Sequence, residues 1–386
     1  MKILFVSDNL IHGFGGGCIE CKKHYHALKQ YCAQKGHELK VISMDNDVPE
    51  KSEVKLEKNR KIDVLCRILG HSSYMYISLL KNKKILEEYN PDAVYFVRSR
   101  LGFMARFFKK HNKNCIVISF HQQEHPLKYA YFADSHGLKG TILKLLERRA
   151  VLNDEKTTIK YTDKLIYLTK RNVRRYEELY NVKNDSADVI PICMENTVDL
   201  TINNGKKNIV FIGSLDYAGN VAAVKSLLND IWSKYYSDNN ELNLIIAGRN
   251  PGKELVEQIK RIPNAQLISN FKAVEDIIPK YSVMLAPIEK GAGMKVKVAE
   301  ALSMGLMVIG SEEALVGYED ALNESGVKLF QCDEINGYKE KIDEYLKMTD
   351  DELAESEKKH KDIFNKYYSY TYSVNALSNI LDRVLK

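Results

Sequence analysis

The chain has 386 residues, of which 45% are hydrophobic and 28% charged, and its formal net charge is +6. This length is typical of two domains that each bury a core, and so small and diffuse a charge does not favour nucleic-acid binding. No apolar run reaches the roughly 18 residues of a membrane span, and the chain enters a strand without a signal peptide. We therefore expect a cytoplasmic protein whose seven scattered cysteines stay reduced.

A glycine-rich segment follows the first predicted strand. Lys2–Ser7 reads as a buried strand, and Gly13–Gly17 leads from it into a helix that extends to about Gln34. Glycines let the backbone approach a ligand and leave helix-terminal N–H groups free for an anion. As a dinucleotide fingerprint the segment is incomplete, because Cys18 stands where the third glycine belongs. The missing glycine weakens a dinucleotide-binding interpretation without excluding it, and a plain tight turn is the alternative.

Two short patterns imitate metal sites. Cys18 and Cys21 form one Cys-x-x-Cys pair on a predicted helix, without a second half-site. Asp45 and Asp47 lie in a long polar loop after the second strand, with no glycines or partners to organise them. We predict no metal site from either pattern.

The helix predicted at residues 98–112 is amphipathic and basic. Its apolar residues stand beside Arg100, Arg106, Lys109 and Lys110. Such a helix can lie on an anionic membrane, or it can pack on a sheet with its lysines in water. Both alternatives remain open from the sequence.

Polar residues follow the predicted fourth strand, Cys115–Phe120, in the order His-Gln-Gln-Glu-His. Open α/β sheets place their sites at the carboxyl ends of such strands. His121 and Glu124 are therefore candidate site residues. The alternative is that His121 only satisfies backbone groups of its loop.

Strands and helices alternate in both halves of the chain, with a polar, irregular linker at residues 193–207. In the second half, strands are predicted at 208–213, 242–247, 265–268 and 283–286, with helices between them. This alternation predicts an α/β protein of two doubly wound parallel sheets, with the chemistry between them. We place the domains at 1–192 and 193–369.

The most informative stretch runs from Pro287 to Ser311. A glycine turn is followed by a helix expected at about Met294 to Met304, with Lys295 and Lys297 in its first turn. Cations are disfavoured at a helix N-terminus by roughly 0.3 to 1 kcal/mol each, so an anion such as phosphate would explain them. Glu300, about one turn beyond Lys297, could bind a sugar hydroxyl of the same ligand. The alternative is a solvated helix start in which Glu300 pairs with a lysine.

This stretch resembles the donor-binding segment of the retaining glycosyltransferases of family 4, which have the GT-B architecture of two facing Rossmann-like domains. The matching residues are Gly291, Gly293, Lys295, Lys297, Glu300, Ala301, Gly305 and Val308. In that family the glutamate matching Glu300 binds the nucleotide ribose. A second glutamate, eight residues earlier, contacts the transferred sugar, and this chain has Ala292 there.

The resemblance extends to the segment Phe211–Asn220 and to His121, which matches a histidine that faces the transferred sugar. Many members carry an arginine and a lysine on the donor phosphates where this chain has Ser214 and Asn220. Positive charge for the phosphates must then come from lysines of the helix start and from Arg249. The donor-binding residues expected in full are Gly16, Gly213, Ser214, Asn220, Arg249, Gly293, Met294, Lys295, Lys297 and Glu300.

The resemblance implies a metal-independent, retaining glycosyltransferase without a cofactor, acting in cell-surface polysaccharide or glycan synthesis. The first domain would bind a saccharide or lipid-linked saccharide acceptor, and the second a nucleotide diphosphate sugar. By resemblance, the final helix, at about 370–386, packs back on the first domain, and peripheral membrane contact is expected. A nucleotide-sugar epimerase of the same architecture and a non-catalytic nucleotide-sugar-binding protein remain as alternatives.

Overall fold

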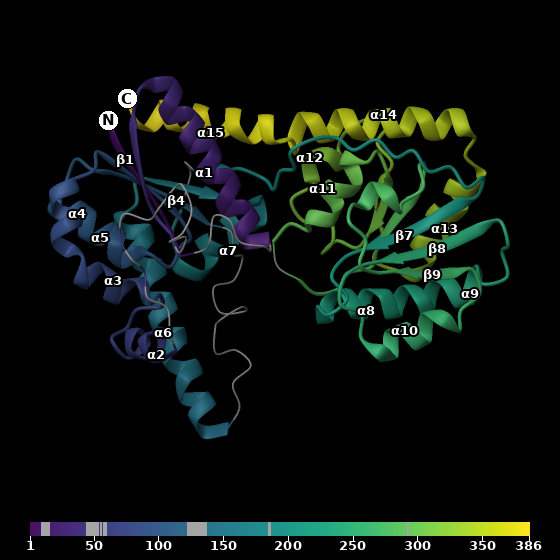
Figure 1. Ribbon diagram of the computed structural model, residues 1–386, viewed down its shortest axis with the longest axis horizontal. Coiled ribbons are helices and arrows are strands. Elements are labelled where there is room, and N and C mark those ends of the chain that lie inside the picture. The colour runs from purple at the N-terminus through teal and green to yellow at the C-terminus, as the bar shows by residue number, and fades with distance from the viewer. Residues whose placement is uncertain are drawn as a thin grey trace. The chain divides into compact units, whose positions relative to one another are not determined.

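The computed structural model describes residues 1–8, 16–43, 54, 56, 60–121, 137–183, 187–291 and 293–386. Its contacts divide the chain into two compact units (Figure 1). The first unit is Met1–Pro191 together with Ser373–Lys386, and the second is Ile192–Tyr372.

The first unit is built on a six-stranded parallel sheet with strand order β2-β1-β3-β4-β5-β6. The strands are β1 Lys2–Ser7, β2 Glu38–Ile42, β3 Ala93–Val97, β4 Ile116–His121, β5 Lys164–Tyr167 and β6 Asp188–Val189. β1, β3 and β4 are almost wholly buried, as expected for a parallel sheet covered on both faces.

Helices cover this sheet on both faces. They are α1 Gly16–Lys35, α2 Arg60–Ile68, α3 Met75–Lys81, α4 Lys83–Tyr89, α5 Gly102–His111, α6 Gly137–Tyr161, α7 Lys170–Tyr180 and α15 Tyr370–Val384. On one face, Phe5 of β1 stacks on Tyr95 of β3 and meets the edge of Tyr25 of α1. On the other face, Leu4 and Val6 join the core formed with α3 and α5. Successive residues of β1 therefore serve opposite layers.

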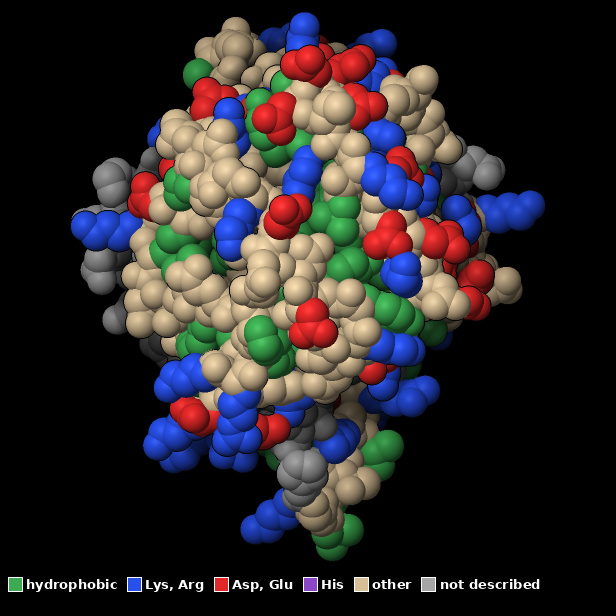
Figure 2. Space-filling model, turned by 90° about the vertical axis from the view of Figure 1, so that its right-hand side faces the viewer, with side chains coloured by type: hydrophobic (Ala, Val, Ile, Leu, Met, Phe, Trp, Pro, Cys, Tyr) green, Lys and Arg blue, Asp and Glu red, His purple; other side chains and the backbone are tan. Residues whose placement is uncertain are grey.

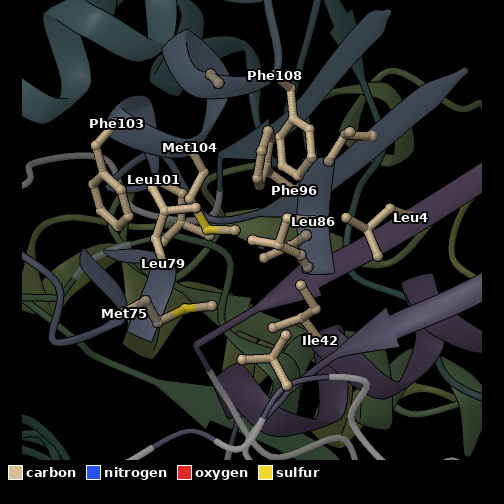
Figure 3. Packing of buried hydrophobic residues seen from close by; sticks show 14 of the residues in the cluster. Leu4, Ile42, Met75, Leu79, Leu86, Phe96, Leu101, Phe103, Met104 and Phe108 are labelled. Carbon is tan, nitrogen blue, oxygen red and sulfur yellow. The ribbon is translucent and has the colours of Figure 1, made fainter. Parts of the chain in front are cut away.

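Helix α5 packs on the sheet. Leu101, Phe103, Met104 and Phe108 are buried in one cluster with strand residues such as Phe96 (Figure 3). Of the two alternatives that the sequence left open for this helix, the structure adopts packing, with Lys110 exposed and Lys109 paired with Asp163. The helix begins at Gly102, four residues later than predicted.

The second unit holds another six-stranded parallel sheet, with strand order β12-β11-β10-β7-β8-β9. Its strands are β7 Lys207–Ile212, β8 Leu242–Ala247, β9 Ala265–Ile268, β10 Val283–Ala286, β11 Met307–Gly310 and β12 Leu329–Gln331. Its helices are α8 Ala218–Ser226, a π-helix Leu227–Trp232, α9 Ser233–Tyr235, α10 Lys253–Lys260, a 3-10 helix Val274–Asp276, α11 Val296–Ser303, α12 Glu319–Leu322, α13 Ile335–Lys347 and α14 Asp350–Tyr367.

Side-chain caps fix where some of these helices begin. Thr349 accepts a hydrogen bond from the N–H of Glu352, whose side chain accepts one from the N–H of Thr349, so α14 starts with a capping box. Thr169 caps α7 by accepting a hydrogen bond from the N–H of Asn172. No helix among the described residues is long and apolar enough to cross a membrane.

A glycine sets the contact between α5 and α6. A Cβ atom on Gly102 would lie 2.0 Å from the carbonyl oxygen of Asp154 and 2.6 Å from the backbone nitrogen of Thr158. Backbone atoms cannot move aside as a flexible side chain can. We expect Gly102→Ala to lower the free energy of unfolding by about 1 to 3 kcal/mol, the range for overpacking.

Urea denaturation followed by circular dichroism measures this loss. Gly252→Ala is the control, because no atom lies within 4 Å of the Cβ that it adds. An equal loss of stability in the two variants would contradict the close approach of α5 to α6.

Candidate functional site

The lysine-rich helix start of the second unit lies at the carboxyl edge of its sheet. β10 ends at Ala286, and α11 begins at Val296, so Lys295 is its N-cap and Lys297 lies in its first turn. No acidic residue occupies that turn, and the side chain of Lys295 makes no cap. Gly293 has φ of +60°, which favours glycine. The helix start is therefore as rich in positive charge as the sequence predicted.

Lys297 reaches from this helix to the end of the neighbouring strand β7. Its Nζ donates a hydrogen bond of 2.7 Å to Oδ1 of Asn220, and it lies 4.1 Å from the ring centroid of Phe211. A Cβ on Gly213 would come within 2.7 Å of the same Nζ, so the glycine makes room for it. Burial lowers the pKa of Lys297 to about 7, although the nearby Glu300 opposes this shift.

Ser214 and Asn220, at the two positions that lack the family's basic residues, form a hydrogen-bonded, uncharged pair next to Lys297. Nδ2 of Asn220 donates to the carbonyl oxygen of Ser214 at 2.8 Å, while its Oδ1 accepts from Lys297. Oγ of Ser214 donates to Asp216, which also accepts from Nδ2 of Asn250. Asn220 therefore orients the lysine instead of supplying charge itself. Arg249 is exposed close to Ser214, because its carbonyl oxygen accepts a hydrogen bond from the N–H of the next residue, Leu215.

Lys295 has an acidic partner that the sequence analysis did not find. Its Nζ donates to Oε1 of Glu313 at 2.9 Å and to the carbonyl oxygen of Gly293 at 2.9 Å. A Cβ on Gly291 would lie 2.6 Å from Cε of this lysine, so Gly291 accommodates the bend of the side chain. The charge of Lys295 is thus partly neutralised within the protein, whereas Lys297 bonds to a neutral amide.

Tyr318 holds the first turn of α11 in place. Its hydroxyl donates to the carbonyl oxygen of Lys295 at 2.8 Å and accepts from the N–H of Ala299 at 2.9 Å. One of the N–H groups that a helix start leaves without an intrahelical partner is satisfied in this way. Met294 is buried, and its sulfur accepts from the N–H of Ile192 at 3.2 Å. Both residues serve the shape of the turn.

Glu300 lies one turn beyond Lys297. Burial raises the pKa of its carboxyl group, and the charge of Lys297 partly offsets that rise. Among the described residues, no ion pair within contact distance joins the two side chains. The alternative in which Glu300 serves only as a structural partner of Lys297 therefore lacks the contact that it requires. Ala292, at the place of the family's first glutamate, lies outside the described residues.

His121 belongs to strand β4 and not to the loop after it, because it pairs with Tyr167 of β5 in the sheet ladder. Its side chain is fully buried against Tyr167 and Tyr176, with Nε2 3.1 Å from Oγ of Ser119. Burial lowers the pKa of His121 to about 3, so the ring is neutral at neutral pH. Nδ1 has no hydrogen-bond partner among the described residues. Glu124 lies outside them.

An ion pair that the sequence analysis missed lies at the carboxyl edge of the first sheet. Asp8 follows β1 and Arg98 follows β3, and these two strands are neighbours. Nε of Arg98 lies 3.0 Å from Oδ1 of Asp8. Arg98 has φ of +150°, which a side chain other than glycine rarely adopts. The placement of polar residues after two adjacent buried strands was the available signal.

Two sequence patterns resembled metal sites, and the structure describes one of them, the pair Cys18 and Cys21. Sγ of Cys21 donates to Oγ of Ser7 at 3.1 Å, and Cys18 is half-buried on the same helix. The part of the chain that the structure describes contains no group of three histidine, cysteine, aspartate or glutamate side chains arranged to hold an ion. Asp45, Asp47 and the glycines before Gly16 lie outside the described residues. Gly16 is the first residue of α1.

Two family models match the sequence. The model described as Glycosyl transferases group 1 matches residues 206–348, and that described as Glycosyltransferase Family 4 matches residues 22–195. The first match lies within the second unit, and the second match covers the first unit from residue 22 and ends at residue 195, just past the division between the units. No curated protein matches the chain at the sequence level.

Solved structures share the fold over the whole length. A lipopolysaccharide outer core galactosyltransferase, WaaB, is 14% identical, with 99% of this chain and 99% of that chain covered and a TM-score of 0.67. Sucrose-phosphate synthase from Thermosynechococcus elongatus is 12% identical, with coverages of 100% and 99% and a TM-score of 0.66. HepE of Anabaena, solved with UDP, is 12% identical, with coverages of 99% and 100% and a TM-score of 0.63. These likenesses confirm the predicted GT-B fold.

The pKa of Lys297 makes stability depend on pH. Between the folded value of about 7 and the ordinary value of 10.5, the unfolded chain binds more protons at this residue than the folded protein. The contribution of Lys297 to the free energy of unfolding therefore rises with pH across this window. We expect the melting temperature of the wild type, relative to that of Lys297→Gln, to increase from pH 7 to pH 9.

Thermal unfolding at several pH values measures this difference. Lys290→Gln, which alters an exposed lysine of the same turn, is the control. Its melting temperature relative to that of the wild type should not change with pH. A difference between the wild type and Lys297→Gln that stays constant with pH would show that Lys297 keeps its ordinary pKa.

Proposed function

The chain belongs to the group 1 glycosyltransferases with the GT-B architecture, and on that premise we propose that it moves a sugar from a nucleotide diphosphate donor with retention of configuration. The acceptor that we propose is a saccharide or lipid-linked saccharide, in the synthesis of a cell-surface polysaccharide or glycan. The likeness to a lipopolysaccharide galactosyltransferase and to a protein solved with UDP supports this choice of acceptor and donor.

The observation that carries the proposal is the position of Lys297. Its ammonium group lies at the carboxyl edge of the second sheet, and the residue itself belongs to the first turn of α11. Backbone N–H groups and a lysine at one point suit a diphosphate, which needs several donors and positive charge. Asn220 of α8 fixes the lysine, so little side-chain freedom remains to be lost on binding.

The two lysines of the helix start have different roles in this proposal. Lys297 is half-buried and bonds to a neutral amide, so no carboxylate within contact distance among the described residues shares its charge. Lys295 already shares its charge with Glu313. We therefore assign the main contact with the diphosphate to Lys297, and to Lys295 the shaping of the turn through Gly293. Glu300, one turn further, is assigned to the nucleotide ribose.

Catalysis would depend on stabilising the departing diphosphate. When the bond between the anomeric carbon and the diphosphate breaks, negative charge grows on the leaving oxygen. Protonated Lys297 and the N–H groups of α11 can stabilise that charge without a metal ion. We propose that Nδ1 of His121, a buried atom with no hydrogen-bond partner among the described residues, bonds to the transferred sugar when the donor is bound. Its ring is neutral at neutral pH, and a neutral ring suits a hydrogen bond to a sugar hydroxyl better than a protonated ring does.

The proposal is tested by the products formed from UDP-sugars and candidate acceptors. A new glycoside with the donor's anomeric configuration is the expected result. An inverted glycoside would reject retention, and an epimerised donor would identify a nucleotide-sugar epimerase. An unchanged donor with intact UDP binding would identify a binding protein without catalysis.

The second unit's site is tested by the binding of UDP and of inorganic pyrophosphate, measured by calorimetry. Lys297→Gln should weaken both about 10- to 150-fold, the range for a hydrogen bond to a charged group. Because a diphosphate must draw a proton onto Lys297 above pH 7, the affinity of the wild type should fall as pH rises, whereas that of the variant should not. Glu300→Gln should weaken UDP binding and spare pyrophosphate.

Lys290→Gln is the matched control, since it removes one exposed positive charge from the same turn. It should change either affinity less than about threefold, because exposed charges interact weakly through water. If Lys297→Gln and Lys290→Gln bind UDP alike, Lys297 does not hold the diphosphate.

His121→Ala tests the role proposed for the first unit. We expect turnover to fall by about one to four powers of ten, with UDP binding preserved. His24→Ala is the control, because His24 is also a buried neutral histidine of this unit, bonded to Tyr95. It removes a similar volume, so it reports the loss due to packing alone. If the two folded variants lose turnover equally, His121 has only a structural role.

A further inference from the structure

The first unit exposes a group of large apolar side chains on α2 and α6. We call these residues and the helix faces that carry them the α2/α6 surface. Its apolar members are between 46% and 81% exposed: Leu65, Ile68, Leu69, Leu138, Ile142 and Leu145. α2 and α6 are in contact with one another, and Arg67 of α2 bonds to Glu147 of α6 at 3.2 Å.

The apolar residues follow the helix period on each element. Leu138, Ile142 and Leu145 are spaced four and three apart, so they form one stripe along the first turns of α6. Leu138 is 81% exposed, which is far more than a residue of the core would be. Figure 1 shows these first turns extending away from the sheet of their unit. Figure 2 shows hydrophobic and basic side chains together on this projecting end.

The acidic residues of both helices point inward. Asp63 of α2 pairs with Arg67, and Glu147 of α6 pairs with the same guanidinium. Asp154 accepts hydrogen bonds from Ser72, and Glu155 accepts from the Ser99 and Tyr176 hydroxyls. All four carboxylates are less than 4% exposed. The interior of the unit therefore uses every carboxylate that these two helices carry.

The charges that remain on the outside of these helices are positive. The exposed basic residues near the apolar stripes are Arg60, Lys61, Lys139, Lys144, Arg148 and Arg149. Helix α4 offers a contrast within the same unit. Its exposed Ile85 lies between Lys83 and Lys84 on one side and Glu87 and Glu88 on the other, and the lysines pair with the glutamates. Exposed apolar residues of this unit are therefore not always surrounded by side chains of net positive charge.

From this combination we propose that the α2/α6 surface docks on an anionic lipid membrane. Apolar side chains flanked by basic ones fit the interface of such a membrane, where the acyl region takes the former and the headgroups attract the latter. A second copy of the chain fits less well, since a two-fold contact would place the same basic residues opposite one another. Membrane contact, which the sequence left open as an alternative for residues 98–112, is thereby assigned to other helices, because α5 is occupied in the core.

This inference does not depend on the donor or on the chemistry proposed above. The affinity for the membrane should be modest and reversible, since each basic residue contributes about fivefold near an anionic surface. High salt should weaken it by screening the headgroups. An acceptor with a lipid anchor would then be met at the surface where it resides.

The test is co-sedimentation of the full chain with vesicles of phosphatidylcholine, alone or mixed with phosphatidylglycerol. We expect binding to the mixed vesicles that is lost in high salt, and little binding to phosphatidylcholine alone. Joint replacement of Leu138, Ile142 and Leu145 by serine should reduce binding at least tenfold. Lys139→Gln with Lys144→Gln should reduce it about 25-fold, as two basic residues are removed.

Ile85→Ser is the matched control, because it removes an apolar side chain of similar exposure from the neutral surface of α4. It should leave vesicle binding unchanged. Circular dichroism checks that every variant is folded, and the lysine variants test the surface even if the triple serine variant does not fold. Absence of wild-type binding, or equal losses in the control, would overturn the proposal. So would a dimer in light scattering that the serine variant abolishes without any vesicle binding.

Discussion

Lys297, held by Asn220 at the positive end of α11, is the interaction on which the arrangement of the second unit's site depends. A lysine at a helix start is opposed both by the N–H groups around it and by its own burial. The structure reduces this conflict by letting the pKa fall to about 7 and by offering the Phe211 ring and an amide oxygen. A bound anion would relieve the remaining unfavourable electrostatics, which is the basis of the diphosphate site that we propose.

The loops around this lysine are shaped by the space that it needs. Gly213 and Gly291 have no side chain where Lys297 and Lys295 respectively pass, and a Cβ at either would meet lysine atoms within 2.7 Å. Tyr318 ties the first turn of α11 from the opposite side. Glycines that resemble a phosphate-binding loop in sequence therefore act here, in part, by admitting lysine side chains.

The first unit solves a different electrostatic problem. Its α6 carries three carboxylates that the interior binds with arginine, serine and tyrosine partners, and burial raises the pKa of Asp154 and Glu155. This inward pairing leaves the outer faces of α2 and α6 basic although the chain as a whole bears only a small net charge. The positive charge of these outer faces thus follows from the pairing of the carboxylates inside the unit.

The sequence by itself determined the parallel sheets, the position of the lysines at the helix start and the absence of basic residues at 214 and 220. These features depend on short-range periodicity and on residue identity, which neighbouring positions encode. Only the tertiary structure decided that Asn220 binds Lys297, that Glu313 neutralises Lys295, that His121 is buried in β4 and that the acids of α6 turn inward. Each of these depends on which strands lie adjacent and which helix face meets the sheet, and residues far apart in the chain fix both.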